Sequence, residues 1–131
     1  MASAAEWFAR ADDASARVGQ QVAAAQERAA TAAQVRVEMD RLRGQARSRR
    51  GEVTVTTDAT GRVVDLRFAD DALELSARDL SRLTLETIEA SRAASGAAAL
   101  DLARAAWGED SSTVAALATE LSRSPRSADD R

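Results

Sequence analysis

The sequence of 131 residues contains no cysteine and no histidine. The absence of cysteine excludes a disulfide framework and a cysteine-based zinc site. The absence of histidine removes the commonest metal ligand and general base. Lysine is also missing, so all 18 basic residues are arginine. Serine and threonine are plentiful, but neither histidine nor lysine is there to activate a hydroxyl group. We therefore expect no enzymatic activity, no metal, no cofactor and no small-molecule substrate.

Large apolar side chains are also scarce. Apolar residues make up 45% of the chain, but 32 of them are alanine, and there are only two phenylalanines and two tryptophans. Such a composition buries little surface in a monomer, and oligomerisation is the usual remedy in small domains. We therefore expect an obligate homodimer. No apolar run reaches the length of a membrane span and no segment resembles a signal peptide. These observations predict a cytoplasmic protein without a membrane partner.

Two long segments have the pattern of helices. Residues 3–46 lack proline, are rich in strong helix formers, and place apolar residues at alternating spacings of four and three. This pattern predicts one long helix with a single apolar seam for a partner. A second helix is expected to begin after Ser76, with Asp79 at its third position, and to end at Gly108. Gly96 within it is either a tolerated flaw or a point of close packing.

Between these helices lies the pattern of a β-hairpin. Residues 51–57 and 62–68 alternate apolar and polar side chains, and the four-residue loop between them ends in Gly61. With Thr57 opposite Arg62, Val55 would face Val64 across the strands. A lone hairpin is marginal in water, so we expect its apolar face to form the central contact of the homodimer. That face consists of Val53, Val55, Val64, Leu66 and Phe68.

The expected organisation is one domain over residues 1–108 and a polar C-terminal tail over residues 109–131. Within this tail, residues 112–121 have the composition for two further helical turns. We expect the residues beyond them to be disordered, because they are polar and carry few apolar side chains. The predicted fold class is α+β, with a long N-terminal helix, a β-hairpin or small antiparallel sheet, and a C-terminal helix.

Six arginines crowd the end of the first helix and the segment after it. Only Glu38 and Asp40 oppose them, so residues 36–50 carry a net charge of +4. Arginine forks suit phosphate oxygens, and such contacts fix position without reading bases. Basic residues at a helix C-terminus also suit the helix dipole, and the net charge of the chain is −3. The arginine cluster, the candidate DNA-binding surface, consists of Arg36, Arg41, Arg43, Arg47, Arg49 and Arg50.

The order of these segments resembles a known family. A long alanine-rich helix and a basic linker precede Gly51-Glu-Val-Thr-Val-Thr, then Gly61-Arg-Val-Val-Asp-Leu-Arg-Phe and the capped helix over residues 80–94. Over residues 10–105 this pattern is similar to the YbaB/EbfC family of bacterial nucleoid-associated proteins. The resemblance implies a tweezer-like α+β homodimer in the nucleoid, whose helices embrace double-stranded DNA with little sequence preference.

Three functions remain open from the sequence, and the hairpin argues against one of them, a purely structural helical oligomer. The expected function is a homodimeric nucleoid-associated protein that binds duplex DNA through phosphate contacts from the arginine cluster. The alternative is a protein-interaction module without DNA binding, a helical partner in a secretion or regulatory complex. The acidic isoelectric point of about 5.0 and the alanine-rich seam favour the alternative. Arg78, Arg82 and Arg92 are diluted by acidic neighbours and are interpreted as part of a solvated helix face.

Overall fold

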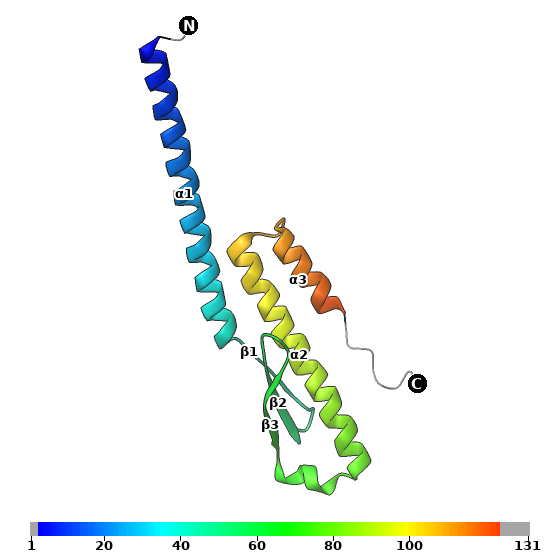
Figure 1. Ribbon diagram of the computed structural model, residues 1–131. Coiled ribbons are helices and arrows are strands. Elements are labelled where there is room, and N and C mark those ends of the chain that lie inside the picture. The colour runs from blue at the N-terminus through cyan, green and yellow to red at the C-terminus, as the bar shows by residue number, and fades with distance from the viewer. Residues whose placement is uncertain (1–2, 124–131) are drawn as a thin grey trace. The chain divides into compact units, whose positions relative to one another are not determined.

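A computed structural model of the chain describes residues 3–123. The chain divides into two compact units, Met1–Gln34 and Val35–Arg131, and the boundary falls inside the first helix. The fold is α+β, as the sequence predicts. In chain order the elements are α1 (Ala4–Arg41), β1 (Arg43–Arg47), β2 (Val53–Asp58), β3 (Val63–Phe68), the 3-10 helix η1 (Asp70–Glu74), α2 (Ala77–Trp107) and α3 (Ser112–Ser122) (Figure 1).

The first unit contains only the N-terminal part of α1. Ser3 and Glu6 cap this helix reciprocally: Ser3 Oγ accepts from the Glu6 N–H at 3.3 Å, and Glu6 Oε2 accepts from the Ser3 N–H at 3.2 Å. Trp7 and Phe8 form an edge-to-face aromatic pair with 5.3 Å between ring centroids. No residue from 3 to 34 is buried. The apolar seam of this segment therefore has no partner within its own unit.

The second unit is built on a three-stranded antiparallel sheet in the order β1-β2-β3. Helix α2 packs against β1 and β2, and α3 runs back alongside the C-terminal part of α2 (Figure 1). Val53, Val55 and Thr57 alternate with half-buried residues along β2 and are fully buried. This alternation is expected of a strand with one face covered by a helix.

The prediction of a helix through residue 46 is wrong, because α1 ends at Arg41 and β1 follows. Strand β1 pairs with β2, and Gly44 lies opposite Thr57. An added Cβ at Gly44 would lie 2.7 Å from the Cα of Ser95 on α2. Glycine weakens a helix and permits close approach of two backbones. Residues 43–47 are therefore stabilised more by pairing with β2 beneath α2 than by a further turn of α1.

The predicted register of the hairpin is wrong: Thr57 pairs with Val63, one residue from the predicted partner, and beyond an irregularity between Thr56 and Thr57 the offset is two residues. Val55 pairs with Leu66, and Val53 pairs with Phe68. The loop explains the shift: Asp58 Oδ1 accepts hydrogen bonds from the Thr60 hydroxyl at 2.6 Å and from the backbone N–H groups of residues 60 and 62 at 3.0 Å. The hydrogen bond from the Thr60 hydroxyl, together with those backbone bonds, lowers the pKa of the Asp58 carboxyl. Because side chains alternate with period two, a two-residue shift keeps the apolar residues on the predicted face.

Helix α2 begins and ends where the sequence predicts. The Ser76 side chain accepts from the Asp79 N–H at 3.1 Å, and Gly108 ends the helix with φ of 82°. Gly96 is a point of close packing, since an added Cβ there would lie 3.1 Å from Leu121 Cδ2 on α3. The buried residues of α2 are small, and none of them is a leucine. They are Thr87, Ser91, Ser95, Gly96, Ala99 and Ala103.

The C-terminal tail contains the helix that its composition predicts. Helix α3 covers residues 112–122, where the sequence indicates two further helical turns. The disorder expected after it concerns mainly residues 124–131, which lie outside the described residues.

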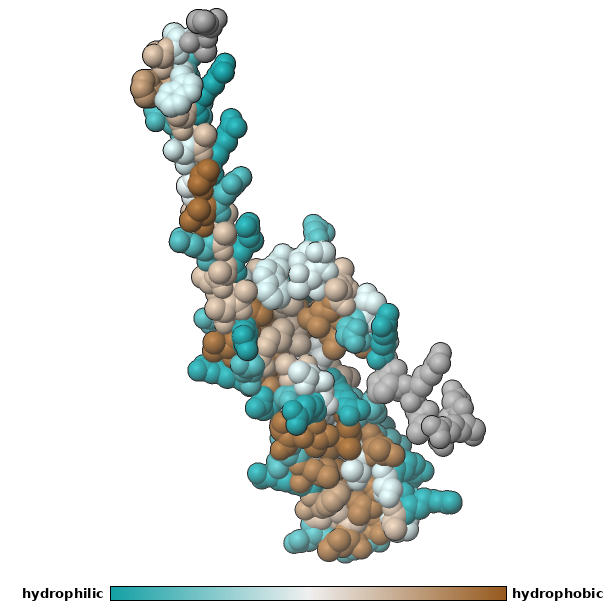
Figure 2. Space-filling model, viewed as in Figure 1, coloured by the Kyte–Doolittle hydropathy of each residue, from teal (hydrophilic) through white to brown (hydrophobic). Residues whose placement is uncertain are grey.

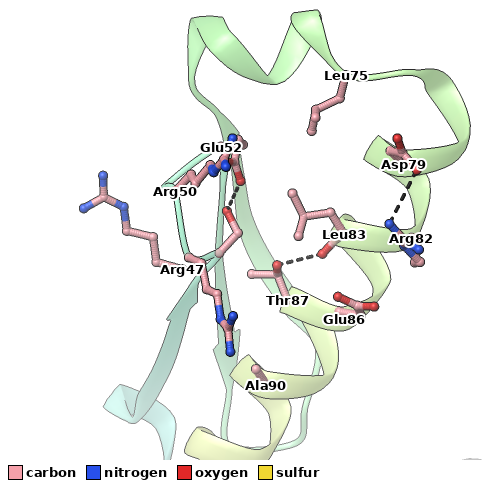
Figure 3. A pocket seen from close by; sticks show the side chains of 12 residues that line it. Arg47, Arg50, Glu52, Leu75, Asp79, Arg82, Leu83, Glu86, Thr87 and Ala90 are labelled. Carbon is pink, nitrogen blue, oxygen red and sulfur yellow. Dashed lines mark hydrogen bonds and ion pairs between the residues drawn. The ribbon is translucent and has the colours of Figure 1, made fainter.

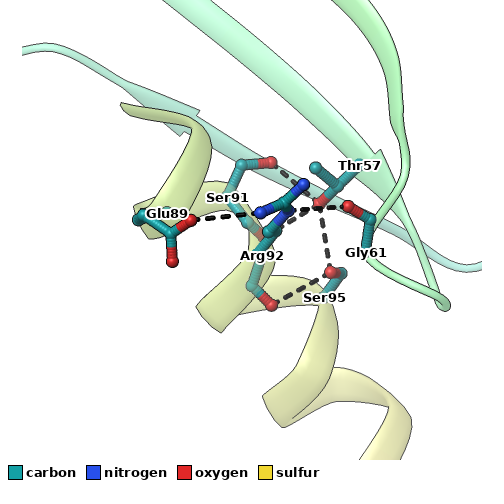
Figure 4. A network of polar contacts seen from close by, with 6 residues as sticks. All are labelled: Thr57, Gly61, Glu89, Ser91, Arg92 and Ser95. Carbon is teal, nitrogen blue, oxygen red and sulfur yellow. Dashed lines mark hydrogen bonds and ion pairs between the residues drawn. The ribbon is translucent and has the colours of Figure 1, made fainter. Parts of the chain in front are cut away.

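A buried hydroxyl network joins α2 to the sheet (Figure 4). The Thr57 hydroxyl lies 2.9 Å from both the carbonyl oxygen and the hydroxyl of Ser91, and 3.0 Å from the Ser95 hydroxyl. The Ser91 hydroxyl in turn donates to the Gly44 carbonyl at 3.0 Å. Each buried hydroxyl therefore has a partner, which avoids the cost of an unpaired polar group. The network fixes how α2 sits on β1 and β2.

Candidate nucleic-acid interface

The arginine cluster spans three consecutive elements of the second unit. Arg36 and Arg41 lie on the last turns of α1, Arg43 and Arg47 lie on β1, and Arg49 and Arg50 occupy the β1–β2 turn. All six side chains are exposed. Within residues 3–123, none of them forms an ion pair with a carboxylate, whereas five other pairs do occur. The arginines of this cluster are therefore not held in ion pairs by carboxylates of the described residues.

Arg43 also has a structural role. Its Nη1 donates to the carbonyl oxygens of Asp40 at 3.0 Å and Leu42 at 2.8 Å. These carbonyls lie at the end of α1, where backbone acceptors lack helical donors. Arg43 thus supports the helix terminus, which is one of the two roles that the sequence left open for these arginines.

The β1–β2 turn that carries Arg49 and Arg50 is closed by several hydrogen bonds. The Gly51 N–H donates to the Ser48 carbonyl at 2.9 Å, and Gly51 has a φ of 75°, which favours glycine. The Ser48 hydroxyl donates to Glu52 Oε2 at 2.9 Å and accepts from the Val53 N–H at 3.0 Å. A turn fixed in this way presents its two arginines to solvent at a defined place.

A cleft of about 490 Å³ separates this turn from the N-terminal half of α2. Figure 3 shows Arg47, Arg50 and Glu52 on one side and the helix residues on the other, with Leu83 between them. On the helix side, Arg82 Nη2 lies 3.4 Å from Asp79 Oδ1. The charge pattern of the sequence places Arg82 on a solvated helix face, apart from the cluster. Only the packing of α2 against the sheet brings residues more than 30 positions apart into one cleft.

The predicted dimer contact separates into two groups in the structure. Val53 and Val55 are fully buried within the chain, whereas Val64, Leu66 and Phe68 remain 41–48% exposed. Leu73 of η1 is 80% exposed. Figure 2 shows apolar side chains gathered over the part of the unit where β3 and η1 lie. Strand β3 is also one of the two edge strands of the sheet. We call Val64, Leu66 and Phe68 the β3 apolar strip.

The described residues contain neither a candidate metal site nor a candidate membrane-spanning helix. Between residues 3 and 123, no three acidic side chains gather in a way that would hold a metal ion. None of the helices described there is both long enough and apolar enough to cross a membrane.

A small α+β unit that displays unpaired arginines on a rigid turn has the chemistry of a protein that binds phosphate-bearing polymers. A comparison with protein families agrees with this class. The model of the YbaB/EbfC DNA-binding family matches residues 15–108, and the chain belongs to this family. It is a family of nucleoid-associated DNA-binding proteins and not a class of enzymes. No curated protein matches the chain. Helix α3 lies beyond the matched residues.

Proposed function

We propose that this protein binds duplex DNA as a homodimer, with little sequence preference, through phosphate contacts from the arginine cluster. The observation that carries the proposal is the exposure of all six arginines, none of which is paired with a carboxylate within residues 3–123. Arginine forks bind phosphate oxygens but carry no sequence information by such contacts. A DNA-binding protein of this family would work in the cytoplasm, on the nucleoid.

The homodimer is supported by the β3 apolar strip. Helix α2 covers β1 and β2, so the apolar side chains of β3 are left half-exposed at the sheet edge. Edge strands with exposed apolar residues are prone to pair with another chain. A second copy would cover this strip and would also double the arginine clusters available to one duplex, which strengthens binding through linked contacts.

The function is tested by gel shift on several random duplexes at two salt concentrations. Wild-type binding should fall steeply with salt, as phosphate contact requires. Arg49→Ala/Arg50→Ala should weaken binding equally for every sequence and lower the salt slope by roughly 0.9 for each phosphate that is no longer neutralised. The control is Arg67→Ala/Arg104→Ala, which removes two exposed arginines that already pair with carboxylates. A wild type that ignores DNA at low salt would overturn the proposal.

The protein-interaction module stays the second candidate because of the first unit. Trp7, Phe8, Val18 and Val22 are all more than half exposed along one helix segment. Exposed apolar residues on a helix face suit a helical partner. Among residues 3–34, three arginines are offset by four acidic residues, so this segment offers no net positive charge to DNA. Absence of DNA binding at low salt would favour this candidate.

A further inference from the structure

We infer that the cleft between the β1–β2 turn and α2 holds phosphate groups, with Arg82 of α2 acting together with Arg47, Arg49 and Arg50. The inference rests on the proposed function, because the DNA backbone is the phosphate source to which it commits. It differs from that function in two respects. It adds a residue from α2, and it holds that Asp79 weakens phosphate binding because it competes for Arg82.

The four arginines reach the cleft from two separate elements. Arg47, Arg49 and Arg50 line the side formed by β1 and its turn, and Arg82 lines the side formed by α2. In the structure Arg82 is turned toward Asp79 (Figure 3), so a phosphate group would receive donors from two directions once Arg82 left that partner. Guanidinium groups donate in a planar fork, so two forks on opposite sides satisfy more phosphate oxygens than a single row. The volume of about 490 Å³ leaves room for such a group without moving the backbone.

The carboxylates that line the same cleft decide how tightly it binds phosphate. Glu52 is nearly buried and is already hydrogen-bonded to Ser48, so it belongs to the turn. Asp79 and Glu86 line the helix side, and four arginines against three carboxylates leave a net charge of only +1. Binding in this cleft should therefore be weak and should respond strongly to the removal of one negative charge.

Asp79 is the carboxylate that competes directly for Arg82. The two side chains form an ion pair of 3.4 Å, one helical turn apart, and both are largely exposed. Exposed pairs of this kind contribute little to stability. A phosphate can therefore replace Asp79 as the partner of Arg82 at small cost. It follows that removing the charge of Asp79 frees Arg82 and also removes a repulsion on the phosphate.

Helix α2 offers a matched control pair outside the cleft. Arg104 and Asp101 stand in the same relation as Arg82 and Asp79, three residues apart, with 3.9 Å between Arg104 Nη1 and Asp101 Oδ1. They do not line the cleft. The experiment compares Arg82→Ala with Arg104→Ala, and Asp79→Asn with Asp101→Asn. Each is measured by salt-dependent binding to random duplex DNA and by calorimetric titration with inorganic tripolyphosphate.

Arg82→Ala should weaken DNA binding several-fold and lower the salt slope by about 0.9, whereas Arg104→Ala should leave both unchanged. Asp79→Asn should tighten binding by about two- to fivefold, the modest scale of exposed charge interactions, and Asp101→Asn should not. Asp79→Asn keeps the test valid if Arg82→Ala fails to fold.

The outcomes separate this inference from the proposed function. If the wild type binds DNA but the Arg82 and Asp79 variants bind like the Arg104 and Asp101 variants, the inference is wrong and the proposed function stands. If the wild type ignores DNA but binds tripolyphosphate through Arg82, the cleft is a phosphate site, but the proposed function and the DNA backbone as the phosphate source are both wrong. If the wild type binds neither probe, both are overturned.

Discussion

At the scale of single residues, small side chains decide how this protein packs. Helix α2 meets the sheet through Ser91 and Ser95, with Gly44 of β1 directly beneath Ser95. Hydroxyl groups replace part of the apolar burial there, and each is satisfied by a partner. Such an interface has little tolerance for added volume, because backbone rather than flexible side chain stands in the way.

Gly44→Ala should therefore destabilise the protein by about 1–3 kcal/mol, the usual cost of an overpacked interior. The added methyl group would meet the backbone of Ser95. Gly19→Ala is the control, because Gly19 lies in the interior of α1 with nothing within 4 Å of an added Cβ. It should instead stabilise the helical state of α1 by up to ~1 kcal/mol, the difference in helix propensity between glycine and alanine. Urea unfolding followed by circular dichroism measures both, and equal effects would show that the packing argument is wrong.

At the scale of elements, α3 depends on α2 for its structure. It has 11 residues, and an isolated helix of this length is marginal in water. Its N-cap is Ser111, whose side chain accepts from the Thr113 N–H at 3.2 Å. Val114 is buried, and Leu121 lies against Gly96. The small residue on α2 and the larger residues on α3 let the two helices approach closely.

Val114→Asp should release α3 while leaving the remainder of the second unit folded, because a buried unpaired charge is costly. We expect hydrogen-exchange protection to disappear over residues 112–122 and to persist in β2 and in the sheet-facing part of α2. Ala115→Asp, at an exposed neighbouring position, should leave protection unchanged. Continued protection of α3 in Val114→Asp would mean that the helix does not need its packing against α2.

At the scale of the whole molecule, the uncovered strand β3 is the feature that points to a partner. Its side chains are all exposed in one chain, although Leu66 and Phe68 pair across from residues that are fully buried. A covered strand beside an uncovered one on the same sheet face supports the proposal that a second copy covers the remaining apolar side chains. A chain with so few large apolar side chains has little other material from which to build a core.

We predict that Leu66→Glu/Phe68→Glu converts the homodimer into monomers at micromolar concentration, because each glutamate would have to be buried in the contact. Analytical ultracentrifugation measures the change. Arg67→Glu places the same residue on the opposite face of the same strand and should leave the dimer intact. If the wild type itself sediments as a compact monomer, the homodimer proposal is wrong.

Local signals in the sequence were enough to predict the helix boundaries of α2 and the existence of the β2–β3 hairpin. Ser76 and Gly108 act through hydrogen bonds and backbone conformation within a few residues. The family was also recognisable, because the order of strand, turn, strand and capped helix is a linear pattern. The face of the hairpin was predictable too, since it depends only on alternation.

What the sequence alone did not determine depends on contacts between distant residues. Strand β1 has the local composition of a helix end, and only its pairing with β2 beneath α2 makes it a strand. The register depends on a shift between Thr56 and Thr57 and on the loop closed by Asp58, neither of which follows from the alternation of apolar residues. The cleft that joins Arg82 to the arginine cluster exists because α2 crosses the sheet, and no spacing along the chain encodes a contact of that kind.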